Sequence, residues 1–116
     1  MTREFVYLPE FEKNFKHMGL SNDTQREIEL LILQNPAIGK VMRGTGGIRK
    51  IRVPLENKGK SGGARVIYID FIIFEKIYML SIFPKSEKDN LTNAERNDLK
   101  TYVGLLENEL RRVAKK

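Results

Sequence analysis

Two strongly apolar segments, residues 64–74 and 77–83, constrain the fold of this chain more than any other feature. Only Glu75 and Lys76 separate them, and both segments are rich in β-branched and aromatic residues. Short, nearly continuous apolar runs of this kind are typical of central strands that are covered on both faces. A third segment, residues 48–55, alternates apolar and cationic residues just before them. The three segments therefore predict an antiparallel meander at the centre of the protein.

Helices are predicted on both sides of this meander in the sequence. Apolar residues recur at steps of three and four over residues 8–18, and Gly19 ends that helix. A second helix begins in residues 21–24, where Thr24 with Glu27 fits a capping box, and ends at Asn35-Pro36. Because the link between them is short, we expect the two helices to pack as an antiparallel hairpin.

The C-terminal part of the sequence predicts a long final helix. It opens at Thr92, which forms a second capping box with Glu95, and carries an apolar stripe as far as Val113. With a short strand at residues 5–7, the element order is β-α-α-β-β-β-α. This order predicts an α+β protein in which a small antiparallel sheet packs with an N-terminal helical hairpin and a long C-terminal helix. A chain of 116 residues is expected to form a single domain, residues 1–116.

The composition excludes several classes of site. The chain has no cysteine and one histidine, which rules out disulfides, thiolate metal sites and thiol nucleophiles. His17 lies one residue off the first apolar stripe, and we interpret it as a surface residue of that helix. We expect no metal and no cofactor. No signal peptide and no membrane span is apparent, so the sequence predicts a cytoplasmic protein without a membrane partner.

Positive charge is concentrated in one part of the chain. The net charge is +6, but residues 40–65 hold eight Lys or Arg against one acid, Glu56, so that segment alone carries +7. The remainder of the chain therefore sums to −1. A local excess of this size indicates a site for a polyanion, most commonly nucleic acid. The cations of the segment are Lys40, Arg43, Arg49, Lys50, Arg52, Lys58, Lys60 and Arg65.

Two motifs, one within the basic segment and one after it, resemble a nucleotide-binding loop and a metal-binding carboxylate pair, but the residues around them do not support either site. Gly59-Lys60-Ser61 resembles part of a phosphate-binding loop, but the loop glycine expected five residues earlier is Pro54, and a strand follows instead of a helix. Residues 56–63 are then either a cationic hairpin that contacts phosphates or a solvated turn. Glu87 and Asp89 could form a carboxylate pair, but neighbouring lysines favour a solvated surface.

Cations on predicted strands are the strongest indication of function. Lys50 and Arg52 share one face of a strand, Arg65 begins the next strand, and Lys85 follows the last one. A rigid sheet holds hydrogen-bond donors more accurately than loops do, and nucleic-acid phosphates require fixed cationic donors. The alternative interpretation is a basic surface that serves only solubility, which this clustering on strands makes weaker.

Four segments of the chain carry a resemblance to a known family. They read Gly47-Ile48-Arg49-Lys50-Ile51-Arg52, Gly59-Lys60-Ser61-Gly62-Gly63-Ala64-Arg65-Val66-Ile67-Tyr68, Tyr78-Met79-Leu80 and Phe83-Pro84-Lys85-Ser86-Glu87-Lys88-Asp89-Asn90-Leu91. These segments resemble the RelE/ParE toxin superfamily, most closely its HigB-type, RelE-like branch. The resemblance covers nearly the whole chain in the family's element order, and its most specific part is the stretch from Gly59 to Tyr68.

The resemblance implies a toxin of a type II toxin–antitoxin system that cleaves messenger RNA in the ribosomal A site without a metal. In such a reaction a ribose 2′-hydroxyl attacks the neighbouring phosphate, which requires a base, an acid and cations. Carried over residue by residue, the catalytic set would be Lys50, Arg52, Arg65, Lys85 and Lys88. Further contacts to RNA are expected from Arg49, Lys58 and Lys60.

The sequence departs from the family pattern where some relatives have a tyrosine, because this chain has Leu91. The identity of the general acid or base therefore stays open. Lys88 or Lys85 could replace the tyrosine, and so could Lys50, because neighbouring cations lower the pKa of a lysine. Tyr68 is a further candidate, although a strand tyrosine of this kind more often serves packing.

The resemblance also implies partners and leaves two other functions open. The expected partners are the ribosome, messenger RNA and a cognate antitoxin, usually of the helix-turn-helix type, with DNA bound only through the antitoxin complex. One alternative is a ParE-like toxin that inhibits a topoisomerase, because a fold does not fix a function. The other is a module that binds RNA without cleaving it, and the absence of the tyrosine favours this alternative.

Overall fold

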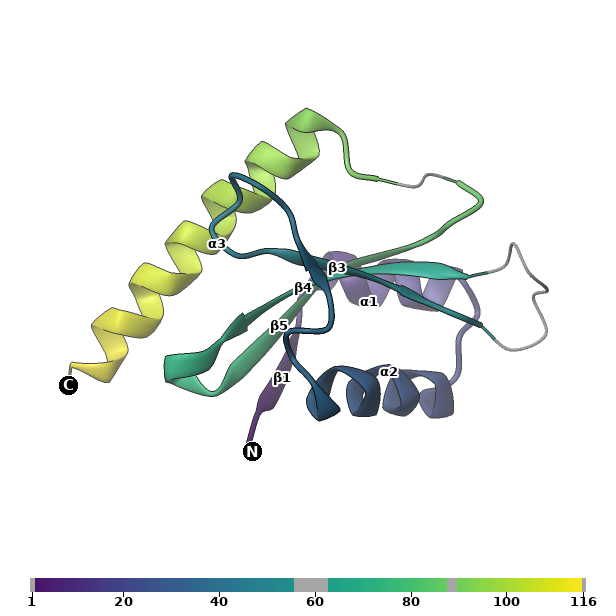
Figure 1. The fold of residues 1–116 in the computed structure, drawn as a ribbon, viewed down its shortest axis with the longest axis horizontal. Helices are drawn as coiled ribbons and strands as arrows, with labels where there is room; N and C mark the ends of the chain where they lie inside the picture. Colours follow the sequence, from purple (N-terminus) through teal and green to yellow (C-terminus); the bar gives the residue numbers. More distant parts are fainter. Residues whose placement is uncertain (1, 56–62, 88–89, 116) are drawn as a thin grey trace.

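The computed structural model describes residues 2–55, 63–87 and 90–115 and contains one five-stranded sheet of order β1-β5-β4-β3-β2 (Figure 1). Strands β3, β4 and β5 form the predicted antiparallel meander, and β1 joins its edge parallel to β5. The α+β class and the long C-terminal helix are confirmed. The elements in chain order are β1 (Glu4–Tyr7), α1 (Pro9–His17), α2 (Asn22–Gln34), β2 (Lys40–Val41), β3 (Arg49–Val53), β4 (Ala64–Phe71), the 3₁₀ helix η1 (Ile72–Phe74), β5 (Lys76–Pro84) and α3 (Asn93–Ala114).

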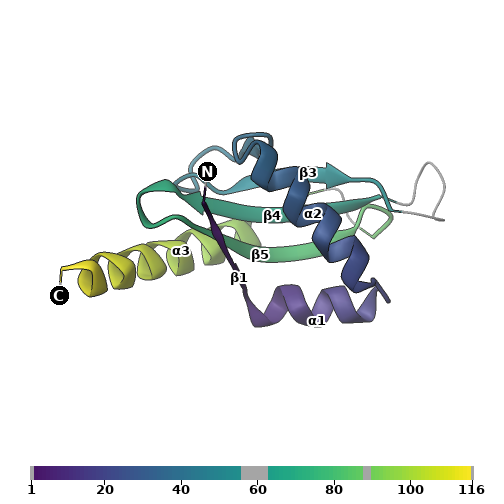
Figure 2. The same ribbon diagram turned by 90° about the horizontal axis from the view of Figure 1, so that it is seen from below.

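The central strands are covered on both faces, as their apolar sequences predict. On one face, Phe11 of α1 and Ile28 and Ile32 of α2 pack with alternate residues of β3, β4 and β5. On the other face, Val103 of α3 packs with the residues in between, including Leu80. Figure 2 shows α2 and α3 on opposite sides of the sheet. The molecule is therefore a layered structure with two hydrophobic clusters, separated by the sheet.

The N-terminal helical hairpin is splayed. Gly19 adopts a positive φ of 68° in the turn after α1, a conformation that glycine adopts without steric cost. From this turn α1 and α2 diverge, and each lies against the sheet (Figure 2). The residue that caps α2 is Ser21, whose side chain accepts a hydrogen bond from the Thr24 N–H, so the expectation of a Thr24–Glu27 capping box is wrong. Ser21 has the extended backbone that a capping residue needs, whereas Thr24 already lies within the helix.

Two other local expectations need correction. Residues 36–47, for which the sequence predicted neither a helix nor a strand, contain the two-residue strand β2, which pairs with β3. The apolar segment 64–74 is not one strand, because β4 ends at Phe71 and η1 follows before Glu75 turns the chain at φ 55°. The capping box of Thr92 and Glu95 at the start of α3 is confirmed. Within the described residues, no helix combines the length and the apolar character needed to cross a membrane.

Candidate functional site

The structure brings three predicted strand cations, together with Lys40 of β2, onto the side of the sheet that faces α3, and we call Lys40, Lys50, Arg52 and Arg65 the cationic face. Lys50 and Arg52 are two residues apart on β3 and therefore point to the same side. Lys40 of β2 lies directly opposite Lys50, and Arg65 of β4 lies directly opposite Arg52. Residues in such antiparallel pairs have Cα atoms only about 4.5–5.5 Å apart. The four side chains therefore form a compact cluster of like charge.

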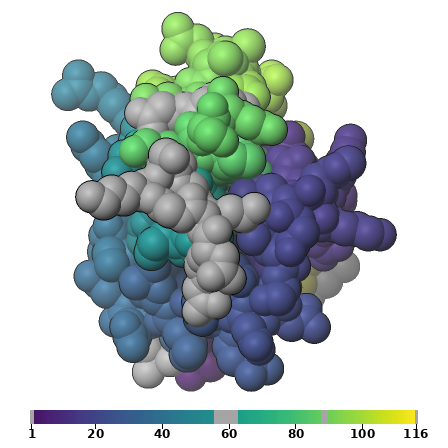
Figure 3. All heavy atoms as spheres, turned by 90° about the vertical axis from the view of Figure 1, so that its right-hand side faces the viewer, coloured from purple at the N-terminus to yellow at the C-terminus, as the bar shows by residue number. Residues whose placement is uncertain are grey.

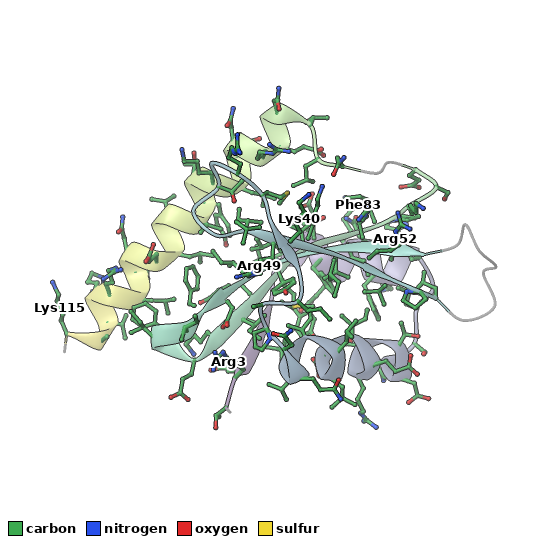
Figure 4. The ribbon with its side chains drawn as sticks, in the orientation of Figure 1. Arg3, Lys40, Arg49, Arg52, Phe83 and Lys115 are labelled. Atoms are coloured by element: carbon green, nitrogen blue, oxygen red, sulfur yellow. The ribbon has the colours of Figure 1, made fainter. Side chains whose placement is uncertain are left out.

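Arg65 is also paired with Phe83 of β5, so that Arg52, Arg65 and Phe83 form a row across three strands. Phe83 is only 4% exposed and packs in the α3-side cluster. Figure 4 shows Lys40, Arg52 and Phe83 on the side of the sheet that lies toward α3 and the segment preceding it. Like charges directly opposite each other destabilise a sheet. Two pairs of like-charged residues, Lys40 with Lys50 and Arg52 with Arg65, therefore lie side by side on this face of the sheet.

The segment between β5 and α3 approaches the cationic face. The Lys50 Nζ donates a hydrogen bond of 2.5 Å to the Asn90 Oδ1. Lys85, just after β5, is held next to the start of β4 because its N–H donates to the Gly63 carbonyl at 2.9 Å. Figure 3 shows this segment, in green, beside the teal atoms of β3 and β4 at one end of the molecule. Residues far apart in the sequence, from β2, β3, β4 and this segment, thus come to one region.

Arg49, which we expected to contact RNA, is the strand cation that the structure separates from the cationic face. By strand alternation it lies on the side of Ile51 and Val53, which pack with α1 and α2. Its guanidinium donates to the carbonyls of Ala37 and Gly39, at 3.2 and 2.7 Å. The geometry of Arg49 is that of a residue that fastens the chain between α2 and β2 to the sheet.

Tyr68, considered above as a general acid or base, is buried on the same side as Arg49 and opposite it in the ladder. Its hydroxyl donates to the Pro36 carbonyl at 2.8 Å and accepts from the Gly39 N–H at 2.9 Å. Burial raises the pKa of the Tyr68 hydroxyl above its ordinary value. Tyr68 therefore serves packing and loop attachment, and the sheet separates it from the cationic face.

Three of the remaining sequence-based candidates, Lys58, Lys60 and Lys88, fall outside the described residues. His17 is exposed on α1, in keeping with its interpretation as a surface residue. Leu91, at the position where some relatives have a tyrosine, is 8% exposed and packs in the α3-side core. Among the described residues, no three His, Cys, Asp or Glu side chains are grouped so that they could hold a metal ion.

Two residues of this region were not singled out by the sequence reasoning. Lys40 was counted only as part of the basic segment, because a two-residue strand in a glycine-rich stretch leaves no detectable alternation. Asn90 was quoted only within the family resemblance, and its contact with Lys50 joins residues 40 positions apart. Its place directly before the buried Leu91 and the cap of α3 was the one available signal that its backbone is held in place.

A small α+β protein with a compact group of cations on its sheet agrees with the toxin family that the sequence resembles, and comparison with known proteins shows that family. The family model described as RelE toxin of the RelE/RelB toxin–antitoxin system matches residues 35–115, well over half of the chain. The chain therefore belongs to the RelE toxin family and is the toxin of a toxin–antitoxin pair, which implies a cognate antitoxin. The match contains the cationic face and does not distinguish the HigB-type branch.

A solved structure supports the fold. The toxin RelE of E. coli, as a double-arginine mutant in the free state, superposes with a TM-score of 0.55 and is 16% identical in sequence. The match covers 77% of this chain and 90% of that chain. At this level of identity the likeness concerns the fold.

Proposed function

We propose that this toxin is an endoribonuclease that cleaves messenger RNA in the ribosomal A site without a metal ion. The observation that carries the proposal is the cationic face, where Arg52 and Arg65 lie opposite each other beside Lys50. Four cations on adjacent strands offer fixed donors to one phosphate group and its neighbours. The expected catalytic set stays Lys50, Arg52, Arg65, Lys85 and Lys88.

The proposed reaction is transesterification within the RNA strand. The 2′-oxygen of a ribose loses its proton and attacks the adjacent phosphorus, while the bond from phosphorus to the departing 5′-oxygen breaks and that oxygen takes up a proton. The products are a 2′,3′-cyclic phosphate and a free 5′-hydroxyl. Negative charge builds up on the phosphoryl oxygens in the transition state, where fixed cations stabilise it more than in the ground state.

Controlled expression tests this proposal directly. Induction of the chain is expected to arrest growth, and mapping of messenger RNA ends is expected to show cuts within translated reading frames. Lys50→Ala and Arg65→Ala should abolish both effects, whereas Lys13→Ala, which removes an exposed cation from α1, should retain them. Full toxicity of the two cationic-face variants, at equal protein level, would refute the site.

One observation favours a second candidate, a module that binds RNA without cutting it. Leu91, at the position where some relatives have a tyrosine, packs into the core, and its side chain has no proton to donate. Such a module would bind RNA with steep salt dependence and leave the message intact. Purified protein on programmed ribosomes separates the two, because only the nuclease produces new 5′-hydroxyl ends.

The finer assignments belong to the same proposal. We expect a HigB-type toxin of one domain, residues 1–116, that acts in the cytoplasm with the ribosome as its partner. The antitoxin is expected to be of the helix-turn-helix type, and any contact with DNA to run through the toxin–antitoxin complex. Lys58 and Lys60 are proposed RNA contacts, and Arg49 is retained as a third, although its hydrogen bonds favour a structural role.

A further inference from the structure

We propose that Asn90 is a positioning residue of the cationic face, which orients the Lys50 ammonium toward bound phosphate without neutralising its charge. The inference rests on the proposed function, and it adds a residue and a reason for that residue's chemical type. It starts from one contact, the hydrogen bond of 2.5 Å from the Lys50 Nζ to the Asn90 Oδ1.

Lys50 needs an external partner to hold one orientation. A lysine side chain has four rotatable methylene groups, and holding it in one orientation costs side-chain entropy. Its directly paired neighbours on the same side are Lys40 of β2 and Ile67 of β4, and Arg52 lies two residues along β3. Lys40 and Arg52 repel the ammonium, and none of the three side chains accepts a hydrogen bond, so these neighbours provide no orienting contact.

Asn90 is suited to this task because the chain that follows it is held in place. Leu91, its neighbour in sequence, is buried in the α3-side core. Thr92, the next residue, caps α3 through a reciprocal pair of hydrogen bonds with Glu95, of 2.9 and 3.1 Å. The Asn90 side chain therefore reaches Lys50 from a backbone that is anchored immediately behind it. The burial of Leu91 therefore helps to hold Asn90 beside Lys50.

The proposal depends on residue 90 being a neutral amide and not a carboxylate. An amide oxygen accepts a hydrogen bond but carries no net charge, so the field of Lys50 remains available to a phosphate. A carboxylate at the same place would also orient the ammonium, but the ion pair would cancel its charge and repel the substrate. Within the described part of the chain, Lys50 forms no salt bridge. Asn90 thus orients the Lys50 ammonium, whose charge no ion pair among the described residues neutralises.

Two substitutions of Asn90 separate orientation from charge. Asn90→Ala removes the acceptor, so the maximal rate of single-turnover cleavage on ribosomes should fall about 10- to 100-fold, with the half-saturating toxin concentration nearly unchanged. Asn90→Asp keeps an acceptor but quenches Lys50, so the half-saturating concentration should rise about 10-fold or more and the salt dependence of binding should become shallower. Asn97→Ala, an exposed asparagine of α3, is the matched control and should change neither quantity.

A measurement that does not depend on cleavage completes the test. In NMR spectra of the free protein, the two Lys50 Hε protons should have different shifts in the native chain, collapse to one shift in Asn90→Ala, and remain distinct in Asn90→Asp. If the native protein does not cleave RNA, the proposed function fails, but these spectra and RNA affinity still decide whether Asn90 orients Lys50. Equal losses in Asn90→Ala and Asn90→Asp, or averaged Lys50 signals in the native chain, would overturn the positioning role.

Discussion

The two sides of strand β3 carry the same kind of residue in opposite circumstances. On one side, Arg49 donates to two backbone carbonyls and lies opposite the buried Tyr68. On the other side, Arg52 is exposed and lies opposite another arginine, Arg65. Three positions apart, one arginine is used to hold a loop and the other is placed where its charge is repelled.

The difference shows which cations of a basic segment carry function. A structural arginine is recognised by acceptors that satisfy its planar donors, because its burial would otherwise cost free energy. An arginine available for binding is recognised by its exposure and by like-charged neighbours directly opposite it. By this criterion the strand cations of residues 40–65 divide into an attachment residue, Arg49, and the four residues of the cationic face, for which we propose a binding role.

Substituting the two arginines of β3 separately gives the largest expected contrast. Arg52→Ala should reduce the cleavage rate about 10²- to 10³-fold, as is usual for loss of one fixed donor to a transition state. Its free energy of unfolding should change by less than about 0.5 kcal/mol, because the side chain is exposed. Arg49→Ala should lower the free energy of unfolding and retain cleavage per folded molecule within about 10-fold. Rates from quantified folded protein and urea denaturation measure both effects.

The opposite outcome would remove the division between the two sides. If Arg49→Ala abolishes cleavage while its unfolding midpoint stays at the native value, Arg49 contacts RNA as the sequence alone suggested. The loop of residues 36–39 would then have to move for the guanidinium to reach the substrate.

The sequence predicted the layers of this fold and most of the cationic face, because both follow from periodicity. Alternation along β3 places Lys50 and Arg52 together and Arg49 apart. Register cannot be read from one strand, so the direct opposition of Arg52 and Arg65 emerged only from the structure. Lys40 and Asn90 were missed for a related reason. A two-residue strand has no period, and the contact from Asn90 to Lys50 depends on where α3 begins relative to the sheet.

The side of the sheet on which Arg49 and Tyr68 hold the loop of residues 36–39 predicts a loss of stability of intermediate size. Tyr68→Phe removes the hydroxyl that joins Pro36 and Gly39 to the sheet and leaves a buried N–H without its acceptor, which costs about 1–3 kcal/mol. Gly39→Ala tests the same contact from the other partner, because a Cβ there would lie 2.7 Å from the Tyr68 hydroxyl oxygen. Thermal unfolding measures both variants. Cleavage per folded molecule should survive in each, and its loss at native stability would assign Tyr68 to the chemistry.

Tyr68 also makes the stability depend on alkaline pH. Burial raises the pKa of its hydroxyl in the folded state, so the folded protein holds this proton more tightly than the unfolded chain. The resulting stabilisation is fully present below the unfolded pKa of about 10 and is lost as the pH rises from there through the folded value. Native protein should therefore lose more stability between pH 9 and pH 11 than Tyr68→Phe. Parallel curves for the two proteins would contradict this assignment.

The cationic face predicts the smallest effect on the free energy of unfolding, and this effect is a gain in stability. Arg52→Thr removes one of two like charges that lie opposite each other and introduces a residue that favours strands, so the free energy of unfolding should increase by about 0.2–1 kcal/mol. Salt at 0.5 M should shrink this gain, because it screens the repulsion in the native protein. Arg43→Thr removes an equal charge from an exposed turn and should produce no gain.

A short RNA should raise the melting temperature of the native protein more than that of Arg52→Thr, because the bound anion relieves the same repulsion. If Arg52→Thr is destabilising at every salt concentration, the two arginines are not in conflict, and the face was built for packing rather than for holding a phosphate.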